Sequence, residues 1–220
     1  MKVNKTIITT IVIIVFSCLL SILSSDFFIG SVILSSGILN IWFQTSGKSY
    51  NYIFACIFNI FNAYVSYING LYGIFVLSLI LYLPLNIIGF ISWNKEKDKN
   101  NIVLFRKYTK YKSLIIIASS LILSIIFGLL LGINKKQKLE FLDSSSNILN
   151  IFGIVLLNNR LNEGWIILLF NNIIDLLIWI INFIHKSPNS FIMMIVSIFY
   201  LIINIYGIYK WKNVKTIDWF

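Results

Sequence analysis

One apolar stretch of the sequence contains a stripe of aromatic and polar side chains. When each residue advances by about 100° around a helix, one quadrant holds Trp165, Asn172, Asp175 and Trp179. Indole faces can stack on a flat heteroaromatic ring and tolerate positive charge, while an amide hydrogen-bonds to hydroxyl or carboxamide groups. The stripe therefore predicts a binding site for a flat, neutral-to-cationic small molecule.

Asp175 is the acidic residue in the middle of an apolar stretch. It could pair with a proton, with a cationic ligand or with a neighbouring amide. Proton coupling would need a relay, but His185 falls at the end of its stretch beside Lys186, where a solvated role is expected. A single intramembrane Asn is most simply a contact between helices, whereas the whole constellation favours a site.

No catalytic or metal-binding pattern accompanies this stripe. The chain has one His, and its two cysteines, Cys18 and Cys56, lie in separate apolar stretches, so neither triad chemistry nor a Cys/His metal site is expected. An integral-membrane lipid enzyme would need clustered acid, base or metal ligands, but Asp143, Glu163 and His185 are scattered. The sequence predicts no enzyme activity, no metal and no cofactor.

Membrane-spanning helices must position these residues. Hydrophobic residues make up 58% of the 220 residues and charged residues 12%, and the mean hydropathy is +0.86. Because a helix needs about 20 apolar residues to cross a bilayer, we predict an all-α integral membrane protein with eight transmembrane helices. The apolar stretches are 6–23, 27–43, 50–68, 71–93, 113–133, 145–157, 164–184 and 191–211.

The distribution of Lys and Arg predicts that both termini are cytoplasmic. Cytoplasmic loops of membrane proteins carry an excess of these residues. Of the 18 Lys and Arg residues, 14 fall on the inner side of the predicted topology, and the other four are Lys135, Lys136, Lys138 and Lys186. The net charge of +10 is thus explained by basic residues on the cytoplasmic side of the lipid bilayer, which is the expected partner. We predict no nucleic-acid binding. We also expect the first stretch to be retained rather than cleaved.

The sequence contains an internal repeat. "YLPLNIIGFISW" (82–93) and "YLIINIYGIYKW" (200–211) share four residue types at an offset of 118: Tyr82 with Tyr200, Asn86 with Asn204, Gly89 with Gly207, and Trp93 with Trp211. In the preceding helices an offset of 113 pairs Asn59 with Asn172. Apolar sequence of low complexity can match by chance, but Gly and Trp are scarce here and fall in register.

The repeat predicts a division of the chain into four parts. These are an extra N-terminal helix (1–26), a first three-helix repeat (27–93), a basic cytoplasmic linker with a connecting helix (94–133), and a second three-helix repeat with a short tail (134–220). Because one connecting helix separates two groups of three, the repeats are parallel, and a substrate is expected between them near the midplane. Pro84 occurs only in the first copy and should kink the fourth helix.

Several segments resemble the PnuC family of bacterial vitamin transporters over about residues 38–212. They include "SGKSYNYIFACIFNIFNAYVSYINGLYG", "LYLPLNIIGFISWNK", "FLDSSSNIL" and "RLNEGWIILLFNN". The resemblance implies a SWEET-like fold of three plus one plus three helices after an extra N-terminal helix. It also implies facilitated uptake of nicotinamide riboside across the bacterial cytoplasmic (inner) membrane, trapping by intracellular phosphorylation, and a homotrimer.

The resemblance also carries over to particular positions. The family pattern matches Glu163, Trp165 and Asn172, and it departs at Ala55, Asn86 and Leu168, which leaves thiamine, riboflavin or a deoxynucleoside as alternative substrates. We assign structural or gating roles to Pro84, Gly89, Glu163 and Gly207. The predicted substrate-binding residues are Asn59, Tyr82, Asn86, Trp165, Asn172, Asp175, Trp179, Tyr200 and Asn204.

Overall fold

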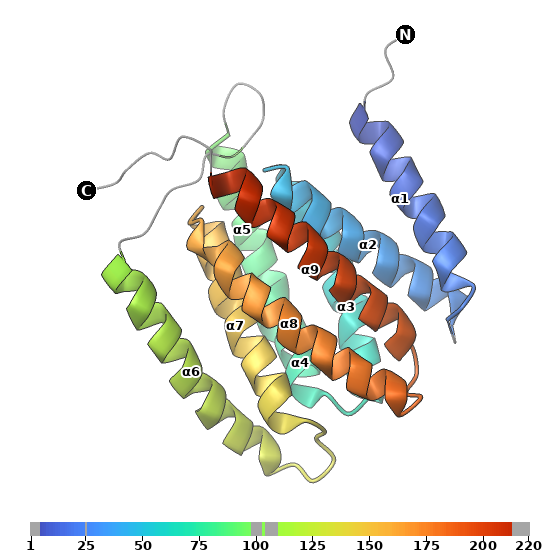
Figure 1. The fold of residues 1–220 in the computed structure, drawn as a ribbon, viewed down its shortest axis with the longest axis vertical. Helices are drawn as coiled ribbons and strands as arrows, with labels where there is room; N and C mark the ends of the chain where they lie inside the picture. The colour runs from blue at the N-terminus through green and yellow to red at the C-terminus, as the bar shows by residue number, and fades with distance from the viewer. Residues whose placement is uncertain (1–4, 25, 98–102, 104–109, 213–220) are drawn as a thin grey trace.

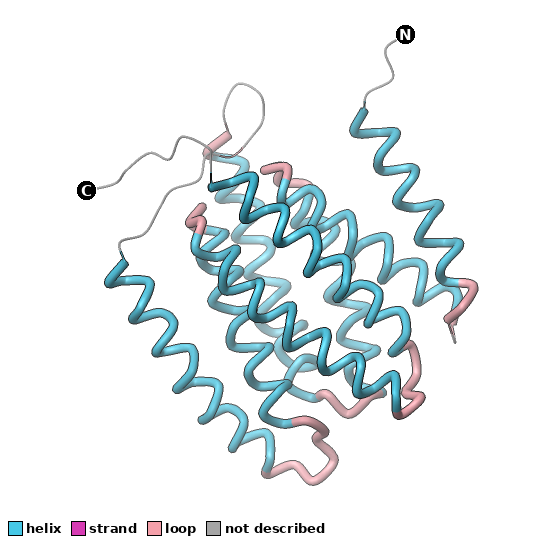
Figure 2. The backbone as a smooth tube through the Cα atoms, viewed as in Figure 1, coloured by secondary structure: helices cyan, strands magenta, loops and turns pink. Residues whose placement is uncertain are grey.

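The computed structural model describes residues 5–24, 26–97, 103 and 110–212, and this part of the chain is a bundle of helices (Figures 1 and 2). Helices α4, η1 and α5 follow one another without a break, so they form one rod. The helices are α1 (Lys5–Ser21), α2 (Phe27–Thr45), α3 (Asn51–Ile68), α4 (Tyr72–Leu77), the π-helix η1 (Ser78–Tyr82), α5 (Leu83–Lys95), α6 (Lys110–Gly132), α7 (Glu140–Asn158), α8 (Glu163–Ile184) and α9 (Ser190–Lys212).

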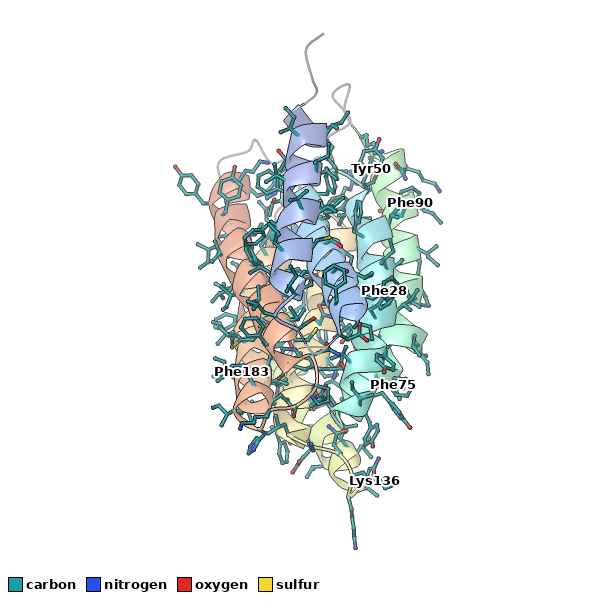
Figure 3. All side chains as sticks on the ribbon, turned by 90° about the vertical axis from the view of Figure 1, so that its right-hand side faces the viewer. Phe28, Tyr50, Phe75, Phe90, Lys136 and Phe183 are labelled. Atoms are coloured by element: carbon teal, nitrogen blue, oxygen red, sulfur yellow. The ribbon has the colours of Figure 1, made fainter. Side chains whose placement is uncertain are left out.

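Five helical segments of the described residues are long and apolar enough to cross a membrane, which makes the chain a multi-pass membrane protein. They are Phe27–Thr45, Tyr72–Lys95, Glu140–Asn158, Glu163–Ile184 and Ser190–Trp211. Two shorter apolar helices, Thr6–Ser21 and Ala118–Gly132, accompany them. Large apolar side chains such as Phe28 and Phe183 are exposed on the rim of the bundle (Figure 3). Such a surface suits lipid rather than water.

The helices pack in an order that leaves α1 and α6 at opposite edges (Figure 1). α2 packs against α3 and α9, α9 against α8, and α8 against α7, while α7 also contacts α4, α5 and α6. α1 packs mainly on α2. The centre of the bundle is therefore surrounded by α2, α3, the α4–α5 rod, α7, α8 and α9.

Two halves of the chain share details at the offset of 113 residues. The bounds of α2, 27 and 45, become 140 and 158 on adding 113, and these are the bounds of α7. After each helix one residue adopts the left-handed conformation, Gly47 at φ 66° and Arg160 at φ 63°. The backbone N–H groups of both donate three residues back, to Gln44 and Leu157. The two helices thus end by the same local geometry.

Two tryptophans fasten the last helix of each half to the first helix of the other half. The indole N–H of Trp93, in α5, donates to the carbonyl of Leu157 in α7 at 2.8 Å. The indole N–H of Trp211, in α9, donates to the carbonyl of Thr45 in α2 at 3.1 Å. Because both bonds lie at the same end of the bundle, they join the two halves there.

Two glycines allow close helix approach beside these tryptophans. A Cβ atom on Gly89 would overlap Tyr52 Cε1, and one on Gly207 would lie 2.9 Å from Trp165 Cζ3. Tyr52 and Trp165 are themselves paired at the offset of 113. Each glycine therefore makes room for an aromatic ring of the preceding helix, while its gating role stays a prediction.

The rod that contains Pro84 changes its helical form just before that residue. Ser78–Tyr82 is a π-helix, and the backbone N–H of Leu83 donates to the carbonyl of Ser78. Pro84 is the second residue of α5, directly after this π-helical turn, and its missing N–H leaves one carbonyl of the preceding turn without a helical donor. Short π-helices often mark functional sites, and this one ends at Tyr82. The kink expected at Pro84 and the gating role of this residue stay predictions.

Candidate functional site

A polar cavity of about 100 Å³ lies at the centre of the bundle. Its walls come from α2, α3, the α4–η1–α5 rod, α7, α8 and α9. The apolar lining is Ile41, Ala55, Phe58, Ile74, Ile154, Leu168, Trp179, Met193 and Val196. The polar lining is Asn40, Gln44, Asn59, Asn62, Tyr82, Asn86, Ser146, Asn147, Asn150, Asn171, Asn172, Asp175, Ser197, Tyr200 and Asn204.

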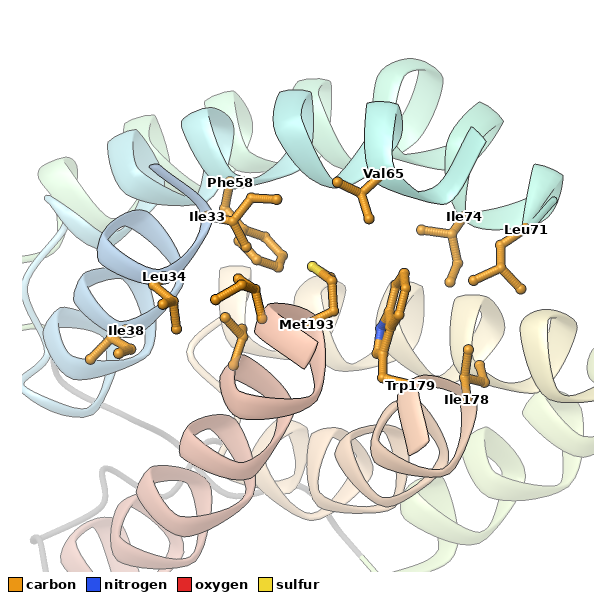
Figure 4. Close-up of a cluster of buried hydrophobic side chains, with 12 residues drawn as sticks. Ile33, Leu34, Ile38, Phe58, Val65, Leu71, Ile74, Ile178, Trp179 and Met193 are labelled. Atoms are coloured by element: carbon orange, nitrogen blue, oxygen red, sulfur yellow. The ribbon is translucent and has the colours of Figure 1, made fainter. Parts of the chain in front are cut away.

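Hydrophobic clusters border this cavity. The first cluster includes Val65, Ile74, Trp179 and Met193; Figure 4 shows Val65 and Ile74 pointing toward Trp179 and Met193 from the opposite side. The second cluster contains Ile41, Tyr52, Trp93, Val103, Leu157, Trp165, Leu168 and Trp211. Members of both clusters line the cavity, so the polar interior lies between two apolar regions.

Eight of the nine predicted binding residues line the cavity. They come from α3, the α4–η1–α5 rod, α8 and α9, and the tertiary structure brings together Asn59, Tyr82, Asn86, Asn172, Asp175, Trp179, Tyr200 and Asn204. Of these, Asn204 is fully buried, and neither its amide nitrogen nor its oxygen has a hydrogen-bond partner among the described residues. Since an unpaired buried amide is costly, Asn204 is available to a bound molecule.

Trp165 is the predicted residue that the structure does not bring to the cavity. Trp165 is 1% exposed and lies in the second cluster, where its ring lies against Gly207. That Trp165 stacks on a ligand beside Trp179 stays a prediction, and in this structure the indole of Trp165 is not part of the cavity lining. The indole of Trp165 fills the end of the bundle, and Trp179 is the indole at the cavity.

Several cavity residues were missed from the sequence. Asn40 and Gln44 enter from α2, and Ser146, Asn147 and Asn150 enter from α7. The α7 residues carried a usable signal, because positions 146, 147 and 150 have the spacing of one helix face. Their helix also starts earlier than the predicted stretch at 145, since Glu140–Asn158 is helical. Its first turns carry buried polar side chains, which lower the hydropathy there.

Asp175 presents a carboxylate with spare acceptor capacity to the cavity. Its Oδ1 accepts a hydrogen bond from the Ser146 hydroxyl, and its Oδ2 accepts one from the Asn171 amide at 3.0 Å. A carboxylate has about four acceptor sites, so the described residues occupy half of them. Trp179 lies one turn further along α8. A negative group and an aromatic face thus stand side by side for a cationic ring.

Tyr200 is held in the cavity wall from two sides. Its hydroxyl accepts a hydrogen bond from the Asn40 amide at 3.1 Å, and its backbone carbonyl accepts one from Asn172 at 3.3 Å. Its ring centroid lies 5.6 Å from that of Phe58. These contacts connect α2, α3, α8 and α9 around one aromatic side chain, so its position depends on both halves of the chain.

The described residues that line the cavity are polar, aromatic, aliphatic or acidic. Among them there is no Lys, Arg or His that could pair with a phosphate. Within the described residues no group of three or more His, Cys, Asp or Glu side chains could hold a metal ion. What the cavity offers is amide and hydroxyl groups, aromatic faces and one carboxylate.

Known proteins resemble the chain over most of its length. A family model described as nicotinamide mononucleotide transporter matches residues 27–213. The nicotinamide riboside transporter PnuC of Neisseria mucosa is 26% identical over 197 residues, which cover 87% of this chain and 74% of that protein. A crystal structure of the vitamin B3 transporter PnuC matches with a TM-score of 0.81 and 24% identity, over 96% of this chain and 92% of that one. The structural match shows that the fold is shared.

Proposed function

Because this chain belongs to the nicotinamide mononucleotide transporter family, we propose that it carries nicotinamide riboside across the membrane by facilitated uptake. The family predicted from the sequence is confirmed, and the related proteins described above are transporters rather than enzymes. We infer that transport runs into the cell and that phosphorylation inside the cell then traps the nicotinamide riboside.

The polar lining of the cavity is the observation that supports this substrate. Nicotinamide riboside has a positively charged pyridinium ring, a carboxamide and ribose hydroxyls. Trp179 can stack on the ring, Asp175 can offset its charge, and nine of the 24 lining residues are Asn, which hydrogen-bonds to hydroxyls and carboxamides. The mononucleotide adds a phosphate, and the described lining offers no Lys, Arg or His to pair with it. The site therefore favours the nucleoside over the nucleotide.

Thiamine is the second candidate, because its thiazolium cation would also meet Asp175. The rings of riboflavin and deoxynucleosides are uncharged, so they would not form a charge interaction with the Asp175 carboxylate. The number of amide side chains favours nicotinamide riboside over thiamine, since the riboside carries more groups that can both donate and accept hydrogen bonds.

A panel of ligands tests this assignment by thermal shift in detergent. A ligand that binds only the folded state stabilises it by about 2.7 kcal/mol at a hundredfold excess over Kd. We expect nicotinamide riboside to raise the apparent Tm, and nicotinamide mononucleotide, riboflavin and thymidine to leave it unchanged. A shift with thiamine alone would replace the proposed substrate, and no shift with any ligand would refute it. Counterflow in proteoliposomes without an ion gradient then checks facilitated transport.

We also propose a topology and an assembly. The described residues form eight helical rods, because α4, η1 and α5 count as one. The shared geometry at the offset of 113 supports two parallel three-helix repeats, 27–93 and 134–220, joined by 94–133 and preceded by the helix in 1–26. In Figure 1 the start of α1 and the end of α9 lie at the same end of the bundle. We propose that the protein is a homotrimer in the bacterial inner membrane and that both of its termini are cytoplasmic.

Cysteine labelling tests this orientation. After Cys18 and Cys56 are replaced by Ser, a cysteine at Lys95 should react with a membrane-impermeant thiol reagent only when the cytoplasmic side is opened. A cysteine at Lys136, which lies at the opposite end of the bundle in Figure 3, should react in intact cells. The side chains of Lys95 and Lys136 are both exposed on the protein surface, so a difference in labelling would report the side of the membrane. The reverse pattern would contradict the topology. Chemical cross-linking in the membrane tests the trimer.

A further inference from the structure

A buried hydrogen-bond chain leads from Asp143 through Asn147 to Tyr82 at the cavity wall. We propose that Asp143 and Asn147 are positioning residues that fix the Tyr82 hydroxyl as a hydrogen-bond acceptor toward the cavity. The site would then select a substrate that presents a hydroxyl or amide N–H to Tyr82. This inference rests on the proposed function and deepens it, because it names a feature that the substrate must have.

The hydrogen-bond chain starts at the Asp143 carboxylate, which can only accept hydrogen bonds. Asp143 is fully buried, and each of its oxygens receives two hydrogen bonds. Oδ1 accepts from the backbone N–H of Ile74 at 3.0 Å and from the amide of Asn147 at 2.7 Å. Oδ2 accepts from the backbone N–H of Gly73 at 2.9 Å and from the amide of Gln137 at 2.6 Å. All of its approximately four acceptor sites are in use. A proton on Asp143 would therefore point at a group that is itself a hydrogen-bond donor.

This carboxylate determines which way the Asn147 amide faces. The Asn147 nitrogen donates to Asp143 Oδ1 and to the Asp143 backbone carbonyl, both at 2.7 Å. A flipped amide would place its oxygen against the carboxylate and lose both bonds. The Asn147 oxygen must therefore point toward Tyr82, and it accepts the Tyr82 hydroxyl at 2.6 Å.

The direction of this last bond determines the chemistry of Tyr82 at the cavity. A tyrosine hydroxyl has one proton, and here that proton is given to Asn147. Tyr82 is 2% exposed and lines the cavity, and the Asn150 side chain also hydrogen-bonds to its hydroxyl, so its oxygen can offer a bound molecule only a remaining lone pair. In nicotinamide riboside the donors that could meet it are the carboxamide NH₂ and the ribose hydroxyls.

Affinity ratios test the proposal. Titration in detergent compares nicotinamide riboside with four analogues that each lack one donor group: 3-acetylpyridine riboside, in which a methyl group replaces the carboxamide NH₂, and the 2′-, 3′- and 5′-deoxy ribosides. We expect the wild type to bind one of them roughly five- to tenfold more weakly, the effect of one lost hydrogen bond. Tyr82→Phe should remove this discrimination. Asn147→Leu should reduce it, because the hydroxyl then keeps only the more distant backbone carbonyl of residue 147 as acceptor, at 3.3 Å, and can rotate to donate to the ligand.

The ratio of the affinities for nicotinamide riboside and its analogues distinguishes a positioning role of Asn147 from a purely structural one. A purely structural effect of Asn147→Leu would weaken all five ligands by a common factor and leave the ratios unchanged. Asn159→Leu, at an exposed position just after α7, is the matched control and should change neither affinities nor ratios. If Asn147→Leu does not fold, Asn147→Ala is measured in cells by competition between the same ligands.

Two results overturn the inference. One is a wild type that binds all five ligands equally, and the other is a pair of variants, Tyr82→Phe and Asn147→Leu or Ala, that keep the wild-type ratios. A wild type that does not bind nicotinamide riboside at all refutes the proposed function instead, and this is seen before any variant is made.

Discussion

Asp175→Asn is expected to lower the affinity for nicotinamide riboside by about 10- to 100-fold while hardly changing the affinity for its reduced, uncharged dihydro form. The two ligands have nearly the same shape and hydrogen-bonding groups, so their difference isolates the charge of the ring. Interactions with a charged partner contribute about 1.5–3 kcal/mol, and 1.4 kcal/mol corresponds to a factor of ten. The two spare acceptor sites of Asp175 at the cavity are the basis for this result.

Isothermal titration of both ligands in detergent measures this effect. Asp26→Asn is the control, because Asp26 is an exposed carboxylate at the start of α2 and contacts no cavity residue through its side chain in the described structure. Asp26→Asn should leave both affinities unchanged. An equal loss of affinity for the charged and uncharged forms in Asp175→Asn would show that Asp175 only supports the wall.

Asp143→Ala is expected to destabilise the protein by several kcal/mol, more than the loss of an exposed carboxylate such as that of Asp26. Four donors, two of them the second and third backbone N–H groups of α4, would lose their acceptor in a buried environment. Each orphaned donor costs about 1–3 kcal/mol, and α4 would lose the only carboxylate at its N-terminus among the described contacts. We expect a greatly reduced yield of folded protein.

Denaturation in detergent, followed by intrinsic fluorescence, measures this loss of stability. Asp26→Ala removes a carboxylate that caps α2 through one hydrogen bond, to the backbone N–H of Ile29 at 3.0 Å. That variant should cost only about 0.5–2 kcal/mol. If Asp143→Ala were no more destabilising than Asp26→Ala, the four hydrogen bonds would contribute little, and the proposed positioning of Tyr82 would lose its foundation.

Asp143 and Asp175 differ in how far the sequence could identify them. From the sequence, Asp175 stood out because it lies in the middle of an apolar stretch, whereas Asp143 was one of several scattered acids. The structure separates their roles by their partners: Asp143 has four donors and no spare acceptor site, while Asp175 has two donors and faces the cavity. Most of those partners lie outside the helix of the carboxylate itself, so no pattern within one helix could identify them.

The sequence by itself determined that this is a helical membrane protein, its family, and seven of the fifteen polar residues that line its cavity. In a bilayer each helix must satisfy its own backbone hydrogen bonds and expose apolar side chains to lipid, so helix positions and polar faces can be read from residue spacing. Eight of the nine predicted binding residues consequently line one cavity.

Only the tertiary structure decided how deep each residue of a polar face lies and which helix it meets. Trp165 and Asp175 share one face of α8, but ten residues separate them by about 15 Å along the helix axis. Trp165 therefore packs at the end of the bundle against Gly207, and Asp175 reaches the central cavity. Periodicity specifies the angle around a helix, whereas depth and neighbours depend on how the other helices pack around it.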